Sequence, residues 1–542
     1  MQKKLSIGLL TALAALAPSV AHATNITEFP DNGSEQMARG GAWAARASDP
    51  LAAYFNPAGL AGQRTGLTLQ ANISTIHTCF TRIRAANDES RDPILGDNPV
   101  AGQSYPRVCN DIKPFLNPQI GATYRVNDRI GIGLAVLPPS GIGSGTWPTF
   151  ISNASGDAAY ASPSRYMLIQ GDAFQLNPTL GIGVEVIDNL RLGASFTWGI
   201  FKAKLNNGVS GQNIGNASPD GNDLAATVIM SDYFVPAVTL GAIYTVGDFL
   251  DIAGTFKWQD TVKASGNLYT QANYFTKKVR DGDRTGVADG DTSYSDCNYG
   301  PSAQGRCSPD SVKFKLAMPM EAKLAFRYHK PRAGAADAHM RDPIKTDVFD
   351  AEVDFTWANN SAIDNMEIRF PGDANGNGVI PINGTPGFAP PNSDIPRHYK
   401  DVFGIRAGGD YNLVPDKLAL RGGVFFETNG QDVKYQNIDF VGAARFGVAT
   451  GATYRLRLGA ERKNALEFHL GFMHVFYQKQ QNDDPNGEGV HAIAGTACNP
   501  AETPSGGVCS TGRQKYRTNW PVNLGSITNA LNVINVGATY RF

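Results

Sequence analysis

Val312-Lys-Phe-Lys-Leu-Ala-Met-Pro-Met-Glu-Ala-Lys-Leu-Ala-Phe-Arg-Tyr328 decides the fold, because apolar and polar side chains alternate along it. A period of two predicts a β-strand. One face carries apolar and aromatic side chains: Phe314, Leu316, Met318, Met320, Leu324, Phe326 and Tyr328. The other face is densely charged: Lys313, Lys315, Glu321, Lys323 and Arg327. An aromatic face opposite a charged one is typical of a membrane barrel that has a wet lumen and a lipid-facing wall.

The same alternation recurs along the chain, for example in residues 349–357 and 534–542. The links between the expected strands are either short or long. Short turns such as Val126-Asn-Asp128 and Val246-Gly-Asp248 alternate with long links. Short inner turns and long outer loops are typical of outer-membrane proteins. We therefore predict an all-β fold, a transmembrane antiparallel β-barrel of about 14 strands. The strands are expected near 66–77, 115–126, 129–138, 172–187, 189–203, 233–246, 248–263, 313–330, 345–358, 399–413, 417–428, 440–456, 462–478 and 532–542.

The N-terminus has the pattern of a secretory signal peptide. Lys3 and Lys4 precede an apolar run over residues 5–17, and small residues around Ala23 fit a cleavage site. We expect residues 1–23 to be removed. The chain holds 48 Lys and Arg against 49 Asp and Glu, so nothing indicates a nucleic-acid partner. Beyond the leader, no apolar run reaches the roughly 18 residues of a transmembrane helix.

The six cysteines of this exported chain fall as three close couples, each within or at the edge of a segment expected to be a long link. Six cysteines allow fifteen pairings, and three local disulfides are the economical interpretation. The predicted pairs are Cys79–Cys109, Cys297–Cys307 and Cys498–Cys509. A zinc site is the alternative, but the chain has no CxxC motif and no His at ligand spacing.

The segment before the first strand is apolar, rich in small residues and broken by the turn Asn56-Pro57-Ala58-Gly59. Asp49-Pro-Leu-Ala-Ala-Tyr-Phe-Asn-Pro-Ala-Gly-Leu60 closely resembles the N-terminal hatch of the FadL/TodX-type outer-membrane transport family, which carries long-chain fatty acids and aromatic hydrocarbons. The terminal Val536-Gly-Ala-Thr-Tyr-Arg-Phe542 looks like that family's last strand. Gly133-Leu-Ala-Val-Leu-Pro-Pro139 is similar to its third strand, which runs into a proline bend. The long loops and the cysteine couples depart from the family pattern.

The resemblance implies that residues 24–65 form a hatch that plugs the lumen of a barrel formed by residues 66–542. The turn of this hatch is expected at Phe55, Asn56, Pro57, Ala58 and Gly59. It also implies that the barrel-assembly machinery reads Phe542 and that the chain lies among the lipids of a Gram-negative outer membrane. We expect a monomer that carries no cofactor.

Prolines and glycines follow the third expected strand, at Pro138, Pro139, Gly141 and Gly143. Proline cannot donate to a ladder and glycine weakens a strand, so these residues either end the strand or open a gap in the wall. The family resemblance favours a gap that faces the hatch turn from Phe55 to Gly59. A hydrophobic cargo that leaves sideways into the bilayer avoids exposure to water, which costs about 25 cal/mol per Å² of apolar surface.

Two loops resemble calcium-binding loops, because oxygen ligands alternate before a glycine at position six. The first offers Asp281, Asp283, Asp289 and Asp291, and the second begins at Asp373. Both lack the bidentate Glu at position twelve, so ordinary acidic or Asn-Gly loops are the alternative.

Motifs of catalysis are scarce, since the chain has no GxSxG, HExxH or Walker sequence. Asp350, Glu352 and Asp354 alternate on one strand face and are expected to form a solvated lumenal wall rather than an acid/base pair. His469 and His474 fall on opposite faces of one strand, which gives no ligand pair.

The hatch motif on a barrel favours passive uptake of hydrophobic compounds, above all long-chain fatty acids. One alternative is a general diffusion porin, which has an inward-folded loop and a charged constriction instead of an apolar plug. A second alternative is a barrel hydrolase of the outer membrane.

Overall fold

The computed structural model describes residues 30–86, 88, 93–96, 98–111, 114–138, 144–152, 159–209, 223–271, 275, 312–334, 340–369, 392–459, 463–484, 489–490 and 521–542. The predicted signal peptide, both predicted calcium loops and the two C-terminal cysteine couples lie outside these residues. Among the helices of the described part, none is long and apolar enough to cross a membrane.

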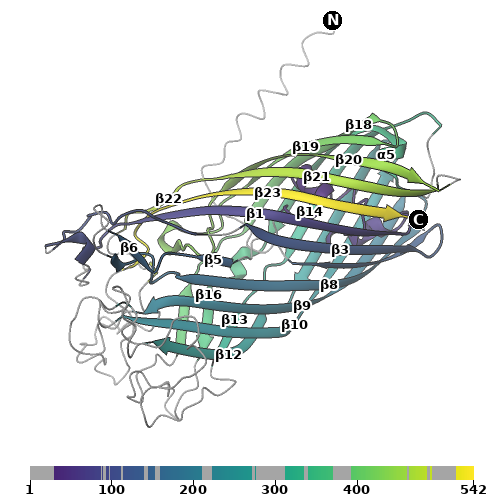
Figure 1. The fold of residues 1–542 in the computed structure, drawn as a ribbon. Helices are drawn as coiled ribbons and strands as arrows, with labels where there is room; N and C mark the ends of the chain where they lie inside the picture. Colours follow the sequence, from purple (N-terminus) through teal and green to yellow (C-terminus); the bar gives the residue numbers. More distant parts are fainter. Residues whose placement is uncertain are drawn as a thin grey trace, which may run out of the picture.

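In this part of the chain, strands at fourteen positions form a closed antiparallel barrel (Figure 1). Ten positions are formed mainly by one strand: β1 (Gly66–Arg82), β3 (Phe115–Arg125), β4 (Ile130–Leu137), β8 (Gln170–Ile187), β9 (Leu190–Val209), β10 (Leu224–Val246), β19 (Leu418–Glu427), β20 (Arg445–Leu458), β21 (Asn464–Tyr477) and β23 (Gly525–Arg541). Four positions hold two strands in line: β11 (Leu250–Gln259) with β12 (Val262–Gln271), β14 (Glu321–Pro331) with β13 (Val312–Leu316), β15 (Asp347–Ala358) with β16 (Asn365–Arg369), and β18 (Val402–Val414) with β17 (Asn392–Pro396).

Closure joins the first strand to the last. β1 and β23 pair along their whole lengths, from Gly66 opposite Arg541 to Arg82 opposite Gly525, and lie side by side in Figure 1. Three short strands extend the barrel sheet in line with β3, β4 and β21: β2 (Val108–Cys109), β5 (Ser144–Thr146) and β22 (Gln480–Asn482). β6 (Phe150–Ser152) and β7 (Ala159–Ala161) pair with each other in a separate sheet. Because closure leaves no sheet edge in the membrane, the backbone polar groups of the wall are satisfied internally.

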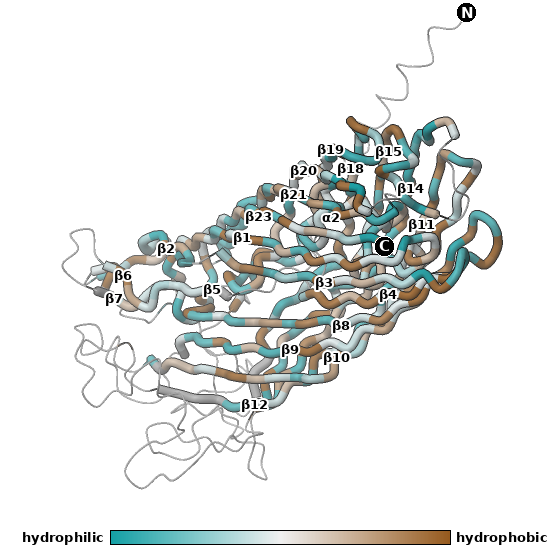
Figure 2. The backbone as a smooth tube through the Cα atoms, turned by 45° about the vertical axis from the view of Figure 1, so that its right-hand side comes forward, coloured by the Kyte–Doolittle hydropathy of each residue, from teal (hydrophilic) through white to brown (hydrophobic). Residues whose placement is uncertain are grey.

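Hydrophobic and hydrophilic residues alternate along the strands of the wall, as the sequence predicts. They are brown and teal in Figure 2. Outward positions hold exposed apolar side chains such as Phe256, Leu324 and Phe326, which face lipid. Inward positions in the same strands are polar or charged, including Asp354 and Arg406. These two groups are buried because the N-terminal segment packs against them, Trp43 on Asp354 and Gly41 on Arg406.

The strands on one side of the barrel break at the same height. β11 ends at Gln259, β14 begins at Glu321, and the β15–β18 ladder ends where Ala358 faces Val402. Above this break line, β12, β13, β16 and β17 continue the wall toward the long loops. Residues 317–320, which include Pro319, form the break between β13 and β14.

The break line inverts the polarity of the wall. In β13, Phe314 is buried and faces inward while Lys313 and Lys315 are exposed. In β14, Phe326 is exposed while Arg327 is buried. The prediction that Phe314 and Phe326 share one face is therefore wrong, since the irregular residues 317–320 reset the alternation. Above the line the inner face is an apolar cup, formed by Phe201, Met230, Val262, Val312, Phe314, Met366 and their neighbours.

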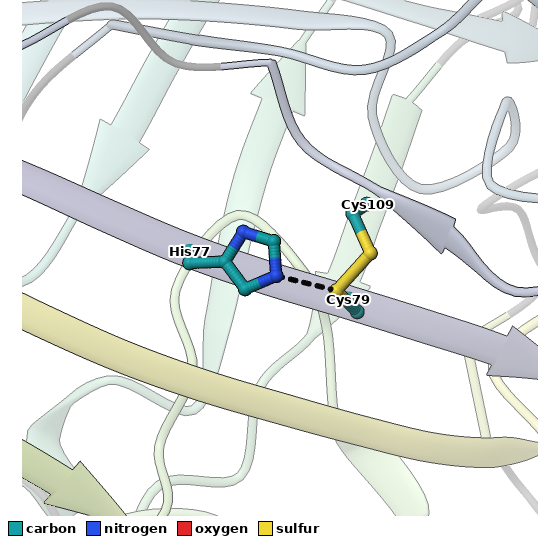
Figure 3. Close-up of side chains that lie close together, drawn as sticks. All are labelled: His77, Cys79 and Cys109. Atoms are coloured by element: carbon teal, nitrogen blue, oxygen red, sulfur yellow. Dashed lines mark hydrogen bonds between the residues drawn. A yellow bond between two sulfur atoms is a disulfide. The ribbon is translucent and has the colours of Figure 1, made fainter.

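Cys79 and Cys109 form a disulfide that joins β1 to β2 (Figure 3). The pair is the one that the sequence predicts, but its setting differs, because β1 extends to Arg82 and places Cys79 on a strand rather than in a loop. His77 Nε2 lies 3.2 Å from Cys79 Sγ, which gathers three potential metal ligands. The two sulfurs are bonded to each other, so neither is a thiolate that could bind a metal.

Candidate functional site

The hatch lies inside the barrel and carries three short helices, α2 (Ser34–Ala38), α3 (Ala52–Phe55) and η1 (Pro57–Leu60). The predicted turn is the junction of the last two. The Asn56 side chain accepts a hydrogen bond from Ala58 N at 3.1 Å and donates one to Ala44 O at 2.7 Å. Pro57 begins η1, where its missing N–H costs nothing. All five predicted hatch residues are buried, from Phe55 to Gly59.

A row of four glycines forms the seat of this turn. Gly131 of β4 is directly opposite Gly183 of β8, which faces Gly193 of β9, which in turn faces Gly241 of β10. A Cβ on Gly183 would lie 2.5 Å from Pro57 O. Cβ atoms at the other three positions would meet Leu60 O, the Pro57–Ala58 backbone and the Asn56 side chain. The hatch backbone thus rests directly on the backbone of the wall.

A second seat lies across the lumen under the first half of the hatch. Gly408 of β18 faces Gly423 of β19, and the Arg39 backbone presses on both. Gly40 adopts φ of 64°, and a Cβ there would lie 2.7 Å from Val424 N. Glycine is required on both sides of this contact, because the backbones approach more closely than a Cβ allows.

Carboxylates of β15 hold the hatch from one side. Asp350, Glu352 and Asp354 all face inward and are almost completely buried. Asp354 Oδ2 accepts hydrogen bonds from Trp43 N and Ala44 N, both at 3.1 Å. The expectation of a solvated wall is wrong, because each carboxylate binds the hatch.

Two hatch arginines complete this charge network. Arg39 Nη1 lies 2.6 Å from Asp350 Oδ1 and 2.7 Å from Asp410 Oδ1, and Arg39 Nη2 lies 3.0 Å from Glu352 Oε2. Arg46 pairs with the second oxygens of Asp350 and Asp410. Buried charges are tolerated when they are paired in this way, and removal of one partner is strongly unfavourable.

Residues 340–346, at the end of the link between β14 and β15, contact the hatch and form a latch that includes helix α5 (Pro343–Thr346). Arg341 N donates to Gly62 O at 2.8 Å, and Arg341 Nη2 donates to Ala45 O at 2.8 Å. Asp342 binds Arg455 of β20 through two hydrogen bonds of 2.7 and 3.0 Å. Burial favours a raised pKa for Asp342, but the charges and hydrogen bonds of Arg455 and its neighbours lower that pKa below its ordinary value.

The apolar cup contains a partly open cavity whose lining is almost entirely apolar. Its wall is formed by aromatic, aliphatic and methionine side chains, among them Phe201, Met230, Phe314, Met318, Met366 and Phe440. The polar lining residues are Gln175 and Tyr399. Within the described part of the chain, Gln175 Oε1 and Tyr399 Oη are buried without a hydrogen-bond partner. No Lys, Arg, Asp or Glu of this part lines the cavity.

A loop between β19 and β20 folds inward over this cup. It carries helix η6 (Val433–Tyr435) and places Phe440 in the cavity wall. Gln436 Nε2 donates to Asn523 O at 2.9 Å and to Gly525 O at 2.8 Å, which ties the loop to the start of β23. The predicted strand 440–456 therefore begins later, at Arg445, because its first residues belong to this loop.

Of the predicted lateral opening, Pro138 lies among the described residues. Pro138 follows the last residue of β4 and is buried, and its carbonyl accepts a hydrogen bond from Asn32 Nδ2 at 3.1 Å. Pro139, Gly141 and Gly143 lie outside the described residues. The hatch reaches the bend through Asn32, whereas η1 rests near the other end of β4, on Gly131. This differs from the expected position of the hatch turn.

Phe542 is exposed at the end of the barrel, and its backbone N donates to Thr65 O at 2.9 Å. The glycine seats, the latch and the cavity were not predicted from the sequence. The seats could have been found from pairs of glycines that lie the same number of residues before and after a short turn. Such residues face each other across a hairpin. The cavity offered no such signal, since its residues come from five or more separate segments.

Comparison with known proteins agrees with this architecture. The sequence profile of the outer membrane protein transport protein family (OMPP1/FadL/TodX) matches residues 11–501. No curated protein matches the sequence. A FadL homologue from Pseudomonas aeruginosa is 16% identical, with a TM-score of 0.61, over 96% of this chain and 100% of that chain. The toluene transporter TodX from Pseudomonas putida is 12% identical, with a TM-score of 0.54, over 95% of this chain and 99% of that one.

At these identities the solved structures show only that the fold is shared. Membership of the family is shown by the sequence profile, which covers most of the chain. This chain belongs to the outer membrane protein transport protein family (OMPP1/FadL/TodX), whose members are Gram-negative outer-membrane channels for hydrophobic compounds rather than enzymes.

Proposed function

We propose that this protein takes up hydrophobic compounds by passive diffusion and that the cargo occupies the cavity of the apolar cup without a charge. The lining of this cavity carries the proposal. Its walls are apolar, and the described part of the chain places no cationic side chain there to pair with a carboxylate. Transfer of an unpaired carboxylate into such surroundings is strongly unfavourable.

The two polar groups of the cavity favour a cargo with one polar end. Gln175 Oε1 can only accept a hydrogen bond, so it suits a ligand hydroxyl or a protonated carboxyl group. A long-chain fatty acid, the cargo favoured by the sequence, fits in its protonated form. An aromatic hydrocarbon fits as it is, and the methionine and phenylalanine side chains give it polarizable contacts.

From the cavity, cargo passes beside the hatch and leaves sideways at the bend after β4. The contact between Asn32 and Pro138 supports this route, because it couples the hatch to the first residue of the bend. Replacement of Pro138 and Pro139 by Val and Thr would extend the ladder. Uptake of a labelled fatty acid and of an aromatic hydrocarbon should then fall while the barrel stays folded, and undiminished uptake would exclude this exit.

Binding to the purified protein tests the cavity. We expect palmitic acid to bind more weakly as the pH rises through its carboxyl pKa, while its methyl ester and toluene bind equally at both ends of the range. Phe314→Ala should weaken binding of all three, because it removes an inward wall of the cavity. Phe326→Ala is the matched control, since this phenylalanine faces lipid.

Tighter binding of the palmitate anion than of the ester would exclude an uncharged cargo. Conductance and hydrolase assays test the two alternative functions, a general diffusion porin and a barrel hydrolase. A large conductance in the intact protein would indicate a general porin, and hydrolysis of an ester substrate would indicate a hydrolase. We further propose that the protein is a monomer and that the assembly machinery reads Phe542.

A further inference from the structure

Polar side chains on the outer surface form one row across five neighbouring strands above the break line. Lys202 of β9 is directly opposite Ser231 of β10, which faces Ser265 of β12. Ser265 faces Lys313 of β13, which faces Arg369 of β16. With strands about 4.8 Å apart, the row extends over roughly 19 Å. Together with the pair one step nearer the membrane, Lys263 and Lys315, we name it the cationic ledge.

The ledge places like charges directly opposite each other twice. Lys263 faces Lys315, and Lys313 faces Arg369, in antiparallel ladders where such pairs are destabilising. Nearby carboxylates offset part of this charge. Glu367 lies 2.9 Å from Lys315 Nζ and 3.1 Å from Arg369 Nη2, and Asp260 lies 3.2 Å from Lys263 Nζ. Asp232 accepts from the backbone of Lys263. Five cations therefore stand against these three carboxylates and Asp394, which lies directly opposite Glu367 on the next strand.

The position of the ledge relative to the bilayer is given by aromatic residues. Trp198, Tyr233, Phe234 and Trp258 are all exposed on β9, β10 and β11, just below it. The rings of Trp198 and Phe234 are 4.7 Å apart, and Lys202 Nζ lies 5.4 Å from the centre of the Tyr233 ring. Exposed aromatic girdles of barrels lie at the membrane–water interface. The ledge consequently lies at the depth of the lipid headgroups on the side of the long loops.

We propose that the cationic ledge binds the phosphate groups of anionic glycolipids in the outer leaflet. Each lysine and arginine supplies charge, and the two serine hydroxyls between Lys202 and Lys313 supply further hydrogen-bond donors. A free phosphate offers the same chemistry, but the ledge is an extended row that continues directly from the lipid-facing wall. A phosphorylated lipid with its acyl chains on that wall meets both surfaces together.

The test uses the full-length protein in phosphatidylcholine nanodiscs with or without lipid A, a phosphorylated acylated disaccharide. We compare the wild type with the variant K263Q/K313Q/K315Q/R369Q by native mass spectrometry of bound lipid. Affinity for lipid A should fall at least about tenfold in the variant, since each surface cation contributes to headgroup attraction. The same loss should follow for the wild type when the lipid is dephosphorylated, or at high salt.

The control variant R107Q/K400Q/K434Q/K479Q removes the same number of charges from exposed positions outside the ledge. Its affinity for lipid A should match that of the wild type. Heat-modifiable migration on gels checks that both variants keep a folded barrel. Equal loss of affinity in the two variants would reduce the effect to net charge and overturn the proposal. Tight binding of inorganic phosphate alone, or equal binding of dephosphorylated lipid, would overturn it as well.

Discussion

Arg39 of the hatch and Asp350 of β15 form an ion pair, with Nη1 and Oδ1 2.6 Å apart, in which neither side chain reaches solvent. The two residues are separated by more than 300 positions in the chain. Asp410 shares the same guanidinium nitrogen at 2.7 Å. One hatch arginine thus joins β15 and β18, and the plug is fixed to the wall by charge as well as by close backbone contact.

Arg39→Gln should loosen the plug. The change leaves Asp350 and Asp410 buried with fewer partners, a loss of about 3–5 kcal/mol in comparable buried pairs. We expect higher single-channel conductance and faster proteolysis of the hatch. Arg129→Gln is the control, because its pair with Asp188 is exposed and contributes little. Conductance that is unchanged in Arg39→Gln would contradict a fixing role for this pair.

A methyl group in the glycine seat should have a similar effect by a steric route. Gly193→Ala places a Cβ against the backbone of Pro57 and Ala58, and overpacking of this kind costs about 1–3 kcal/mol. Gly254→Ala on β11 is matched to it, since its Cβ would find its nearest atom at 3.9 Å. Thermal unfolding and conductance of the two variants should differ, and equal values would show that the seat tolerates a side chain.

The latch should open in acid. Because the pKa of Asp342 is lowered in the folded protein, its ion pair with Arg455 contributes stability above the ordinary carboxyl pKa of about 3.9. That contribution is lost as the pH falls below this value through the lowered pKa. Conductance recorded at neutral pH and at pH 5 should agree and should rise only in stronger acid. In Asp342→Asn the elevated conductance should already be present at neutral pH.

The two cysteine couples outside the described residues are expected to form local disulfides. Non-reducing peptide mapping should recover the links Cys297–Cys307 and Cys498–Cys509 beside Cys79–Cys109, which the structure contains. Each short loop closure contributes about 2–4 kcal/mol against unfolding of its loop. A peptide that joined the two C-terminal couples to each other would contradict the local pairing.

Sequence periodicity predicted the barrel because each lipid-facing residue, such as Phe326, is followed by an inward one, such as Arg327. Periodicity failed at Phe314, because the irregular stretch around Pro319 changes which alternate positions face inward. The residue types in that stretch do not indicate the change. The carboxylates at Asp350 and Glu352 were recognised as one inward face, but their partners were not. Those partners come from a segment some 300 residues away, and periodicity carries no information on such contacts.

The inverted polarity of the apolar cup means that one chain folds against two solvents. Below the break line, burial in hydrocarbon gives no hydrophobic gain between strands, and hydrogen bonds and packing hold the wall. Above it, water drives Val312, Phe314 and Met366 inward, as in a soluble domain. Unfolding of the cup exposes apolar side chains to water and therefore has a positive heat-capacity change. The free energy of unfolding of the cup should curve with temperature for this reason, whereas that of the membrane-embedded wall should not.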